Sequence, residues 1–172
     1  MDSTETTRSR SRVITWEDPR VPLARRQNLP GLDVLKQVIE GRLPMPPMGT
    51  LMNIRLVQAE RGYIVFEGTP EEYHYNPLGT IHGGFAATLL DSAMGCCVHS
   101  CLDTGDRYTT LDIKVNYLKA LTVDTGQVRG IAKIVHVGKT IALAEARVVD
   151  ASDVIYAHAT STCVIKRHGS GG

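Results

Sequence analysis

Two glycines and one carboxylate lie in the most apolar stretch of this chain, and their types suit chemistry on a carbonyl group. Gly83 and Gly84 come at the head of the stretch, and Asp91 lies in its middle. Glycines at a helix start expose unpaired N–H groups to a substrate, and with the helix dipole they can stabilise a negative oxygen. Alternatively, they only let the preceding loop pack tightly. An ionised carboxylate in a buried helix is costly unless it is paired, hydrated or open to a cleft, which is typical of functional groups.

Gly83 and Asp91 lie too far apart on one helix to act on the same reacting group. At ~1.5 Å per residue, their separation along the helix axis is ~12 Å. A donor to the negative oxygen and a catalytic carboxylate must each come within about 3 Å of the reacting group or of its attacking water. Two antiparallel copies of the helix satisfy this requirement, so we expect a two-fold symmetric dimer with two composite sites.

Hydrophobic periodicity predicts the elements that position these residues. The residues from His82 to Cys101 predict a helix that is apolar on nearly every side and therefore buried. A short amphipathic helix is expected at Leu32–Ile39, followed by a loop at Pro44–Gly49. Strand patterns lie at 51–58, 63–69, 111–117, 127–137, 140–150 and 154–166.

The strand patterns after residue 110 follow one another with short turns, which predicts antiparallel pairing between consecutive strands. The fold class is therefore α+β, with a curved antiparallel sheet wrapped around a central helix. An exposed strand edge is expected, and covering that edge favours an oligomer.

Composition limits the function classes. The 172 residues suit one domain, and 19 basic against 18 acidic residues give no reason to expect nucleic acid or a membrane as partner. The sequence contains no run of about 18 apolar residues, so no membrane span is predicted. Without a CxxC pair, the four cysteines predict buried reduced thiols rather than disulfides or a metal site, which favours a cytoplasmic location. The cysteines are Cys96, Cys97, Cys101 and Cys163.

The ends of the chain differ in composition from its middle. We expect a flexible N-terminal segment at 1–28, a single domain at 29–167 and a flexible tail at 168–172. The arginine-rich stretch Arg8–Arg12 is able to bind a phosphate, but a solvated segment is the simpler interpretation.

The residues from Asn76 to Asp91 read Asn-Pro-Leu-Gly-Thr-Ile-His-Gly-Gly-Phe-Ala-Ala-Thr-Leu-Leu-Asp, and this run resembles the hotdog-fold thioesterases. The resemblance is to the phenylacetate-degradation type and to an animal group of acyl-CoA thioesterases. It continues through Leu111–Tyr117 and Gly138–Ala142. It implies a hotdog fold, hydrolysis of acyl-CoA without a cofactor or metal, and assembly as dimers, usually dimers of dimers.

The resemblance also implies roles for individual residues. Asp91 matches the catalytic carboxylate, acting either as general base on water or as nucleophile. Gly83 matches the backbone oxyanion donor, and Asn76 and His82 match polar groups near the thioester. Thr110 stands where some relatives use a serine to orient the water.

Structural alternatives exist for several of these residues. His82 is also explained as a helix-start residue, Asn76 as a turn residue before Pro77, and Thr110 as an ordinary strand residue. Lys139 is a candidate for the phosphates of coenzyme A, although a hairpin turn explains it equally well.

Two further assignments concern substrate binding. Gly84 accompanies Gly83 at the helix head, and Met48 is either a core cap or part of the wall of an acyl pocket. Aryl-acetyl, hydroxybenzoyl and medium-chain fatty acyl groups all remain compatible with the sequence. The rival functions are a hotdog enoyl-CoA hydratase or dehydratase, and a non-catalytic acyl-CoA-binding protein.

Overall fold

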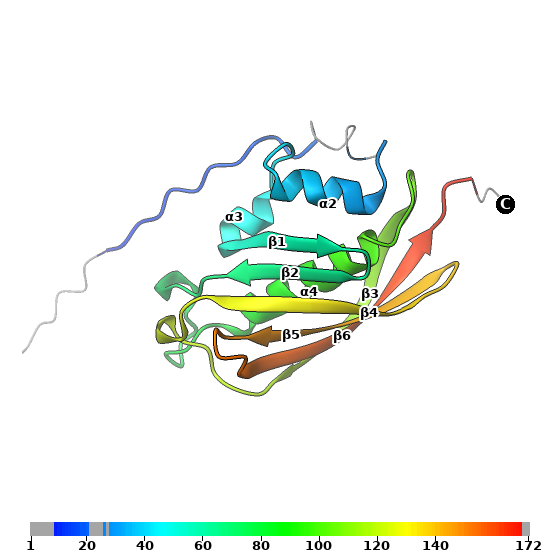
Figure 1. Cartoon of the computed structure of the whole chain (residues 1–172). Helices are drawn as coiled ribbons and strands as arrows, with labels where there is room; N and C mark the ends of the chain where they lie inside the picture. Colours follow the sequence, from blue (N-terminus) through cyan, green and yellow to red (C-terminus); the bar gives the residue numbers. More distant parts are fainter. Residues whose placement is uncertain (1–8, 21–25, 27, 170–172) are drawn as a thin grey trace, which may run out of the picture.

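A central helix wrapped by a curved antiparallel sheet dominates the structure (Figure 1). The computed structural model describes residues 9–20, 26 and 28–169. The expected α+β architecture is confirmed. Parts of the expected N-terminal segment and tail, namely residues 1–8, 21–25, 27 and 170–172, lie outside the described residues.

The sheet contains six strands in the order β1-β2-β4-β5-β6-β3, and all neighbouring pairs are antiparallel. Their bounds are β1 Ile54–Glu60, β2 Tyr63–Gly68, β3 Arg107–Tyr117, β4 Val128–Val137, β5 Ile141–Val149 and β6 Ile155–Lys166. The prediction that consecutive strands pair is correct for β4, β5 and β6 but wrong for β3. After β3, residues 118–127 cross the molecule through a 3-10 turn at Val123–Thr125, so β3 pairs with β6 at the far edge.

Two short helices lie at the β1 side of the sheet (Figure 1). The predicted amphipathic helix is α2, Gly31–Ile39. The predicted loop at Pro44–Gly49 is only partly correct, because α3 occupies Pro47–Met52 and delays β1 to Ile54. Pro47 suits the first helical position, where its missing N–H is not needed, and Asn53 ends the helix in the left-handed region with φ 53°.

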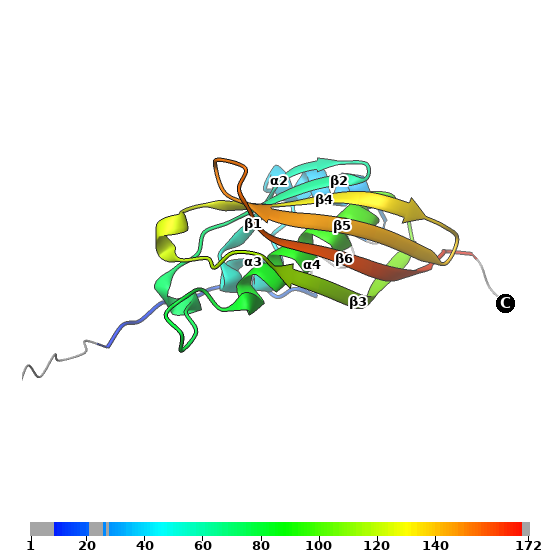
Figure 2. The ribbon, with the colours of Figure 1, turned by 90° about the horizontal axis from the view of Figure 1, so that it is seen from below.

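The central helix α4, Gly83–His99, packs against β2, β4, β5 and β6 and runs beside β3 (Figure 2). Its inner side buries Leu89, Leu90, Ala93, Met94 and Cys97 completely. Close approach to β4 requires Gly130, since a Cβ atom there would lie 2.8 Å from Leu89 Cγ. The sheet therefore encloses one side of α4 tightly.

The outer side of α4 is not enclosed in the single chain, and this corrects the expectation of a helix buried all round. Gly84, Ala87, Thr88 and Ser92 are partly exposed, and Asp91 is exposed. At helical spacing these residues form one strip, which faces away from the sheet. Asp91 is therefore hydrated in the protomer, and the desolvation cost expected for a buried carboxylate does not arise there.

Candidate active site

Two predicted site residues from different elements meet at the middle of α4. The hydroxyl of Thr110 on β3 donates to Asp91 Oδ1 at 3.4 Å. Thr110 lies opposite Cys163 of β6, at a point where the register shifts, and the Cys163 Sγ is 4.0 Å from the Thr110 hydroxyl. The strand thus presents a hydroxyl beside the exposed carboxylate.

The head of α4 leaves one backbone N–H for a ligand. His82 is the N-cap, and its Nδ1 accepts the N–H of Gly84 at 2.8 Å, so the Gly84 amide is already occupied. The N–H of Phe85 donates to the carbonyl of His82 at 3.0 Å. Within the described part of the chain, no acceptor is recorded for the N–H of Gly83. Gly83 is the stronger oxyanion candidate of the two glycines.

Tyr117, which sequence reasoning treated only as a strand residue, packs on this helix head. Its hydroxyl donates to the carbonyl of Gly83 at 3.2 Å. A Cβ atom on Gly83 would come within 3.1 Å of the tyrosine ring, so the absence of a side chain permits this contact. No sequence signal pairs the end of β3 with the start of α4, because the contact depends on the crossing of the two elements.

Asn76 closes its own turn. Its Oδ1 accepts the N–H of Leu78 at 2.8 Å, and its Nδ2 donates to the Thr80 hydroxyl at 3.0 Å. The backbone N–H of Asn76 donates to the carbonyl of Thr80 at 2.8 Å. These bonds are the ones expected if Asn76 is a turn residue before Pro77. They leave one Nδ2 hydrogen for other contacts.

His74, a buried histidine in the same loop, is a residue that the sequence did not single out. It lies in the 3-10 turn Glu72–His74, and its carbonyl accepts the N–H of His82 at 2.7 Å. Its ring lies 4.8 Å from that of Phe85, and its Nε2 is buried without a hydrogen-bond partner among the described residues. Burial lowers the pKa of His74 from its ordinary value, and the positive charge of Arg12 lowers it further.

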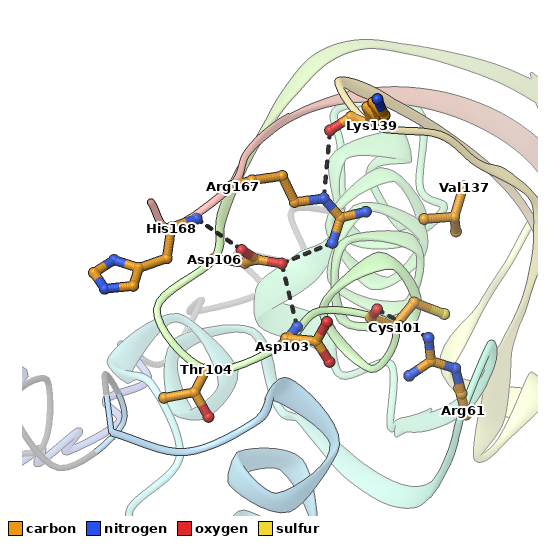
Figure 3. A pocket seen from close by; sticks show the side chains of 9 residues that line it. All are labelled: Arg61, Cys101, Asp103, Thr104, Asp106, Val137, Lys139, Arg167 and His168. Carbon is orange, nitrogen blue, oxygen red and sulfur yellow. Dashed lines mark hydrogen bonds and ion pairs between the residues drawn. The ribbon is translucent and has the colours of Figure 1, made fainter. Parts of the chain in front are cut away.

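The two remaining predicted residues lie apart from this arrangement. Met48 is on α3 and is 47% exposed. Lys139 lines a separate cavity of about 640 Å³ beside Cys101, which follows the C-terminal end of α4 (Figure 3). Neither Asp91 nor Gly83 lines that cavity.

Positive charge gathers in the Lys139 cavity. Arg61 and Arg167 also line it, so three cationic side chains face two carboxylates, Asp103 and Asp106. Arg167 bonds Asp106 at 2.7 Å (Figure 3). It also donates to the carbonyl of Gly138 at 2.9 Å. Burial pushes the pKa of Asp106 upward, but its hydrogen bonds from the backbone and from Arg167 outweigh this and hold the pKa below its usual value.

The cysteines are free thiols, and burial raises the pKa of Cys96 and of Cys97 to about 12. Cys96 and Cys97 therefore stay neutral at physiological pH. Within residues 9–20, 26 and 28–169, no group of His, Cys, Asp or Glu side chains is arranged to hold a metal ion. Across the same residues, no helix has both the length and the apolar character needed to cross a membrane.

Solved structures with similar folds include proteins related to phenylacetic acid degradation. A putative thioesterase related to phenylacetic acid degradation, from Ralstonia eutropha, superposes with a TM-score of 0.69 at 20% identity over 76% of this chain and 98% of its own. The Escherichia coli PaaI protein of the phenylacetic acid degradation operon gives 0.68 at 17% identity over 80% and 96%. At these identities the likeness concerns the fold, and it confirms the expected hotdog architecture.

Sequence comparisons agree with the fold. Residues 78–157 match the model of the family described as "Thioesterase superfamily". A putative esterase of Halobacterium salinarum is 38% identical over 88 residues, which are 50% of this chain but only 56% of that protein. Acyl-coenzyme A thioesterase 13 of Mus musculus is 30% identical over 111 residues, 64% of this chain and 78% of the mouse protein. The chain belongs to the thioesterase superfamily.

Proposed function

We propose that this protein hydrolyses acyl-CoA thioesters to a free acid and CoA. The observation that carries the proposal is that one helix bears both an exposed Asp91, which accepts a hydrogen bond from Thr110, and a Gly83 N–H that meets no acceptor among the described residues. The name of the mouse relative, an acyl-coenzyme A thioesterase, supports the substrate class.

In the reaction, the thioester oxygen lies against the N–H of Gly83. As negative charge develops on that oxygen, one such donor contributes about 3–4 kcal/mol to stabilising the transition state. Asp91 takes a proton from water, whose oxygen adds to the carbonyl carbon, or else attacks that carbon itself and forms an anhydride that water then cleaves. The carbon–sulfur bond breaks, and the CoA thiolate leaves.

His82 and Thr110 support these steps. Because His82 Nδ1 accepts the Gly84 N–H, the neutral ring carries its proton on Nε2, which is then a donor for the leaving sulfur. The Thr110 hydroxyl, held by Asp91, orients the attacking water. With Nδ1 engaged as a helix cap, His82 gives no support to a hydratase, in which a histidine must share proton transfer at carbon.

The proposed site is completed by a second copy of the chain. Gly83 and Asp91 remain ~12 Å apart along α4, and the outer strip of α4 is open in the protomer. Beside it, β3 is an edge strand with Leu111 59% and Ile113 37% exposed. An antiparallel copy packed here would set Gly83 of one protomer beside Asp91 of the other, and assembly of such dimers into a tetramer follows the resemblance.

Substrate contacts complete the proposal. The cavity with Lys139 and Arg61 offers cations that match the phosphates of CoA. Met48, exposed on α3, serves as a flexible wall for the acyl group, which is an aryl or medium-chain group. The neutral buried thiols are in keeping with a cytoplasmic location.

The test is thiol release from a panel of acyl-CoA substrates, comparing wild type with Asp91→Asn and Asp91→Ala. We expect both variants to lose about 10²–10⁴-fold in kcat with an unchanged melting temperature. Asp33→Asn, which changes an exposed carboxylate in the first turn of α2, serves as control and keeps the wild-type rate. Residual hydrolysis near the control rate in both Asp91 variants would refute the assignment.

The two chemical routes are separable. Single-turnover hydrolysis in isotopically heavy water, followed by mass analysis of the peptide containing Asp91, labels the protein only if the carboxylate attacks the thioester directly.

A further inference from the structure

We propose that Arg12 is a positioning residue for the head of α4, which it holds through the loop that contains His74. The segment around Arg12 lies outside the part of the chain that matches the thioesterase family, residues 78–157. The proposal rests on the function proposed above, because the group that Arg12 positions is the oxyanion donor Gly83.

The guanidinium of Arg12 contacts two elements at once. Its Nη2 donates to the carbonyl of Thr50 at 2.7 Å, and its Nη1 donates to the carbonyl of Leu51 at 3.1 Å, near the C-terminal end of α3. The same group lies 4.2 Å from the centroid of the Tyr73 ring, in a cation–π contact. Arg12 thereby joins α3 to the 3-10 turn of the loop before α4.

From Tyr73, a short series of contacts leads to the oxyanion donor. The Tyr73 ring packs edge-on against that of His74, with centroids 4.4 Å apart. The carbonyl of His74 accepts the N–H of His82 at 2.7 Å. His82 is the N-cap of α4, and Gly83 follows it directly. A shift of the 3-10 turn therefore displaces the residue that sets the direction of the Gly83 N–H.

Arg10 adds a second link through an ion pair with Glu72 in the same turn. The Arg10 side chain is 74% exposed and that of Glu72 45%, and exposed ion pairs contribute little. Arg12, with two carbonyl acceptors and a ring, is the main attachment.

The charge of Arg12 also affects the protonation of His74. The Nδ1 of His74 accepts the N–H of Glu71 at 3.0 Å, which requires this nitrogen to be unprotonated. After burial, Arg12 is the next largest cause that lowers the pKa of His74, while Glu71 opposes it. The neutral rings of Tyr73 and Phe85 pack against the same imidazole.

The direction of the pH effect follows from this arrangement. The pKa of His74 lies below its ordinary 6.5, so the neutral, loop-closing form persists as pH falls until that lowered pKa is reached. Removing the charge of Arg12 raises the pKa of His74. Protonation then breaks the Glu71–His74 bond at a higher pH, and the acid limb of the kcat profile moves to higher pH.

The experiment compares the full-length chain with Arg12→Ala, Arg12→Lys and Arg20→Ala by thiol release between pH 5 and 8. The control Arg20 belongs to the same segment but bonds Asp18 within it. We expect Arg12→Ala to lose about fivefold to tenfold in kcat with little change in KM, since a transition-state donor is displaced. The acid limb of its kcat profile should move to higher pH. Arg12→Lys keeps the positive charge, so its acid limb should lie at the wild-type pH.

A second readout does not depend on activity. Hydrogen exchange measured by mass spectrometry should show faster exchange at residues 74–84 in Arg12→Ala than in wild type or Arg20→Ala. Unchanged exchange, or an acid limb that moves equally in Arg12→Lys, overturns the positioning role. If wild type releases no thiol while exchange responds as expected, the proposed function fails and the positioning of the helix head stands.

Discussion

The Thr110 hydroxyl has a single proton, and the structure directs it to Asp91 Oδ1. Its oxygen can accept from Cys163, whose Sγ lies 4.0 Å away. A hydroxyl held on both sides presents its remaining lone pair in a fixed direction, which suits the positioning of a water molecule.

We expect Thr110→Val to lower kcat about tenfold to a hundredfold, because it removes the hydroxyl and keeps the shape of the side chain. Thr110→Ser should stay within about threefold of wild type. Thr109→Val, on the adjacent exposed position of β3, is the control. Thiol release measures all three, and a Thr110→Val variant as active as this control would reduce Thr110 to an ordinary strand residue.

At this scale the sequence singled out candidate groups, whose catalytic roles stay predictions. Glycine and aspartate at the head and middle of an apolar helix are unusual choices, so Gly83 and Asp91 were identifiable from residue type alone. His74 and Tyr117 were not, because no sequence pattern pairs His74 with His82 or Tyr117 with Gly83. The hydrogen bond from the Gly84 N–H to His82 Nδ1 was not predictable either, because it depends on the direction of the His82 side chain, which periodicity does not describe.

Among the elements, the contact between α4 and the sheet depends on glycine. Gly130 on β4 faces Leu89, and the added Cβ of an alanine would lie 2.8 Å from Leu89 Cγ and 3.4 Å from the Leu89 carbonyl oxygen. The carbonyl distance is an ordinary van der Waals contact, so the strain falls on Leu89 Cγ, which lies one bond beyond Cβ and moves only if the side chain turns about χ1 or the helix shifts. The depth at which α4 sits, and hence the place of Asp91 relative to β3, follows from this position.

Gly130→Ala should therefore destabilise the fold by about 1–3 kcal/mol through overpacking, measured by urea unfolding. Leu89→Ala alone removes buried volume and costs about 2–5 kcal/mol. Because the two side chains share one space, the double variant should be more stable than the sum of the single losses indicates. Strict additivity would show that the helix does not press on β4 at this point.

Element types were largely predictable, but two arrangements were not. The alternation of residues 111–117 predicts β3, yet its neighbour is β6 rather than β4, since pairing depends on how the intervening chain crosses. The proline-rich stretch before residue 50 predicted a loop, whereas Pro47 begins a helix because proline is tolerated in the first turn.

For the whole molecule, the open strip of α4 lies on the same side as the edge strand β3. In the protomer, Asp91 and Gly83 lie on one helix and cannot approach each other. Our proposal of a composite site therefore makes assembly a condition of activity, and mixing two inactive variants tests it.

The two variants are Asp91→Ala and Gly83→Pro. Proline removes the Gly83 N–H at the first position of α4, and His82, with φ −58° and ψ 135°, already has the backbone conformation that a following proline requires. A Cβ atom at this position would lie 3.1 Å from the Tyr117 ring, so the tyrosine side chain must give way. After co-refolding, up to about a quarter of the wild-type rate should return, because half of the dimers are mixed and one of their two sites is intact. Mixed dimers that form and remain inactive would exclude a shared site.

Because β3 pairs with β6, the last strand of the chain, its pairing must wait until synthesis is nearly complete. The strand with Thr110 leaves the ribosome well before β6, the strand with which it pairs, and the edge that β6 will cover stays open until residues 155–166 emerge. Nascent chains of neighbouring ribosomes on one messenger would meet with that edge uncovered, a state prone to pairing between molecules. Interruption of translation within residues 155–166 therefore yields an aggregation-prone fragment rather than an enzyme of reduced activity.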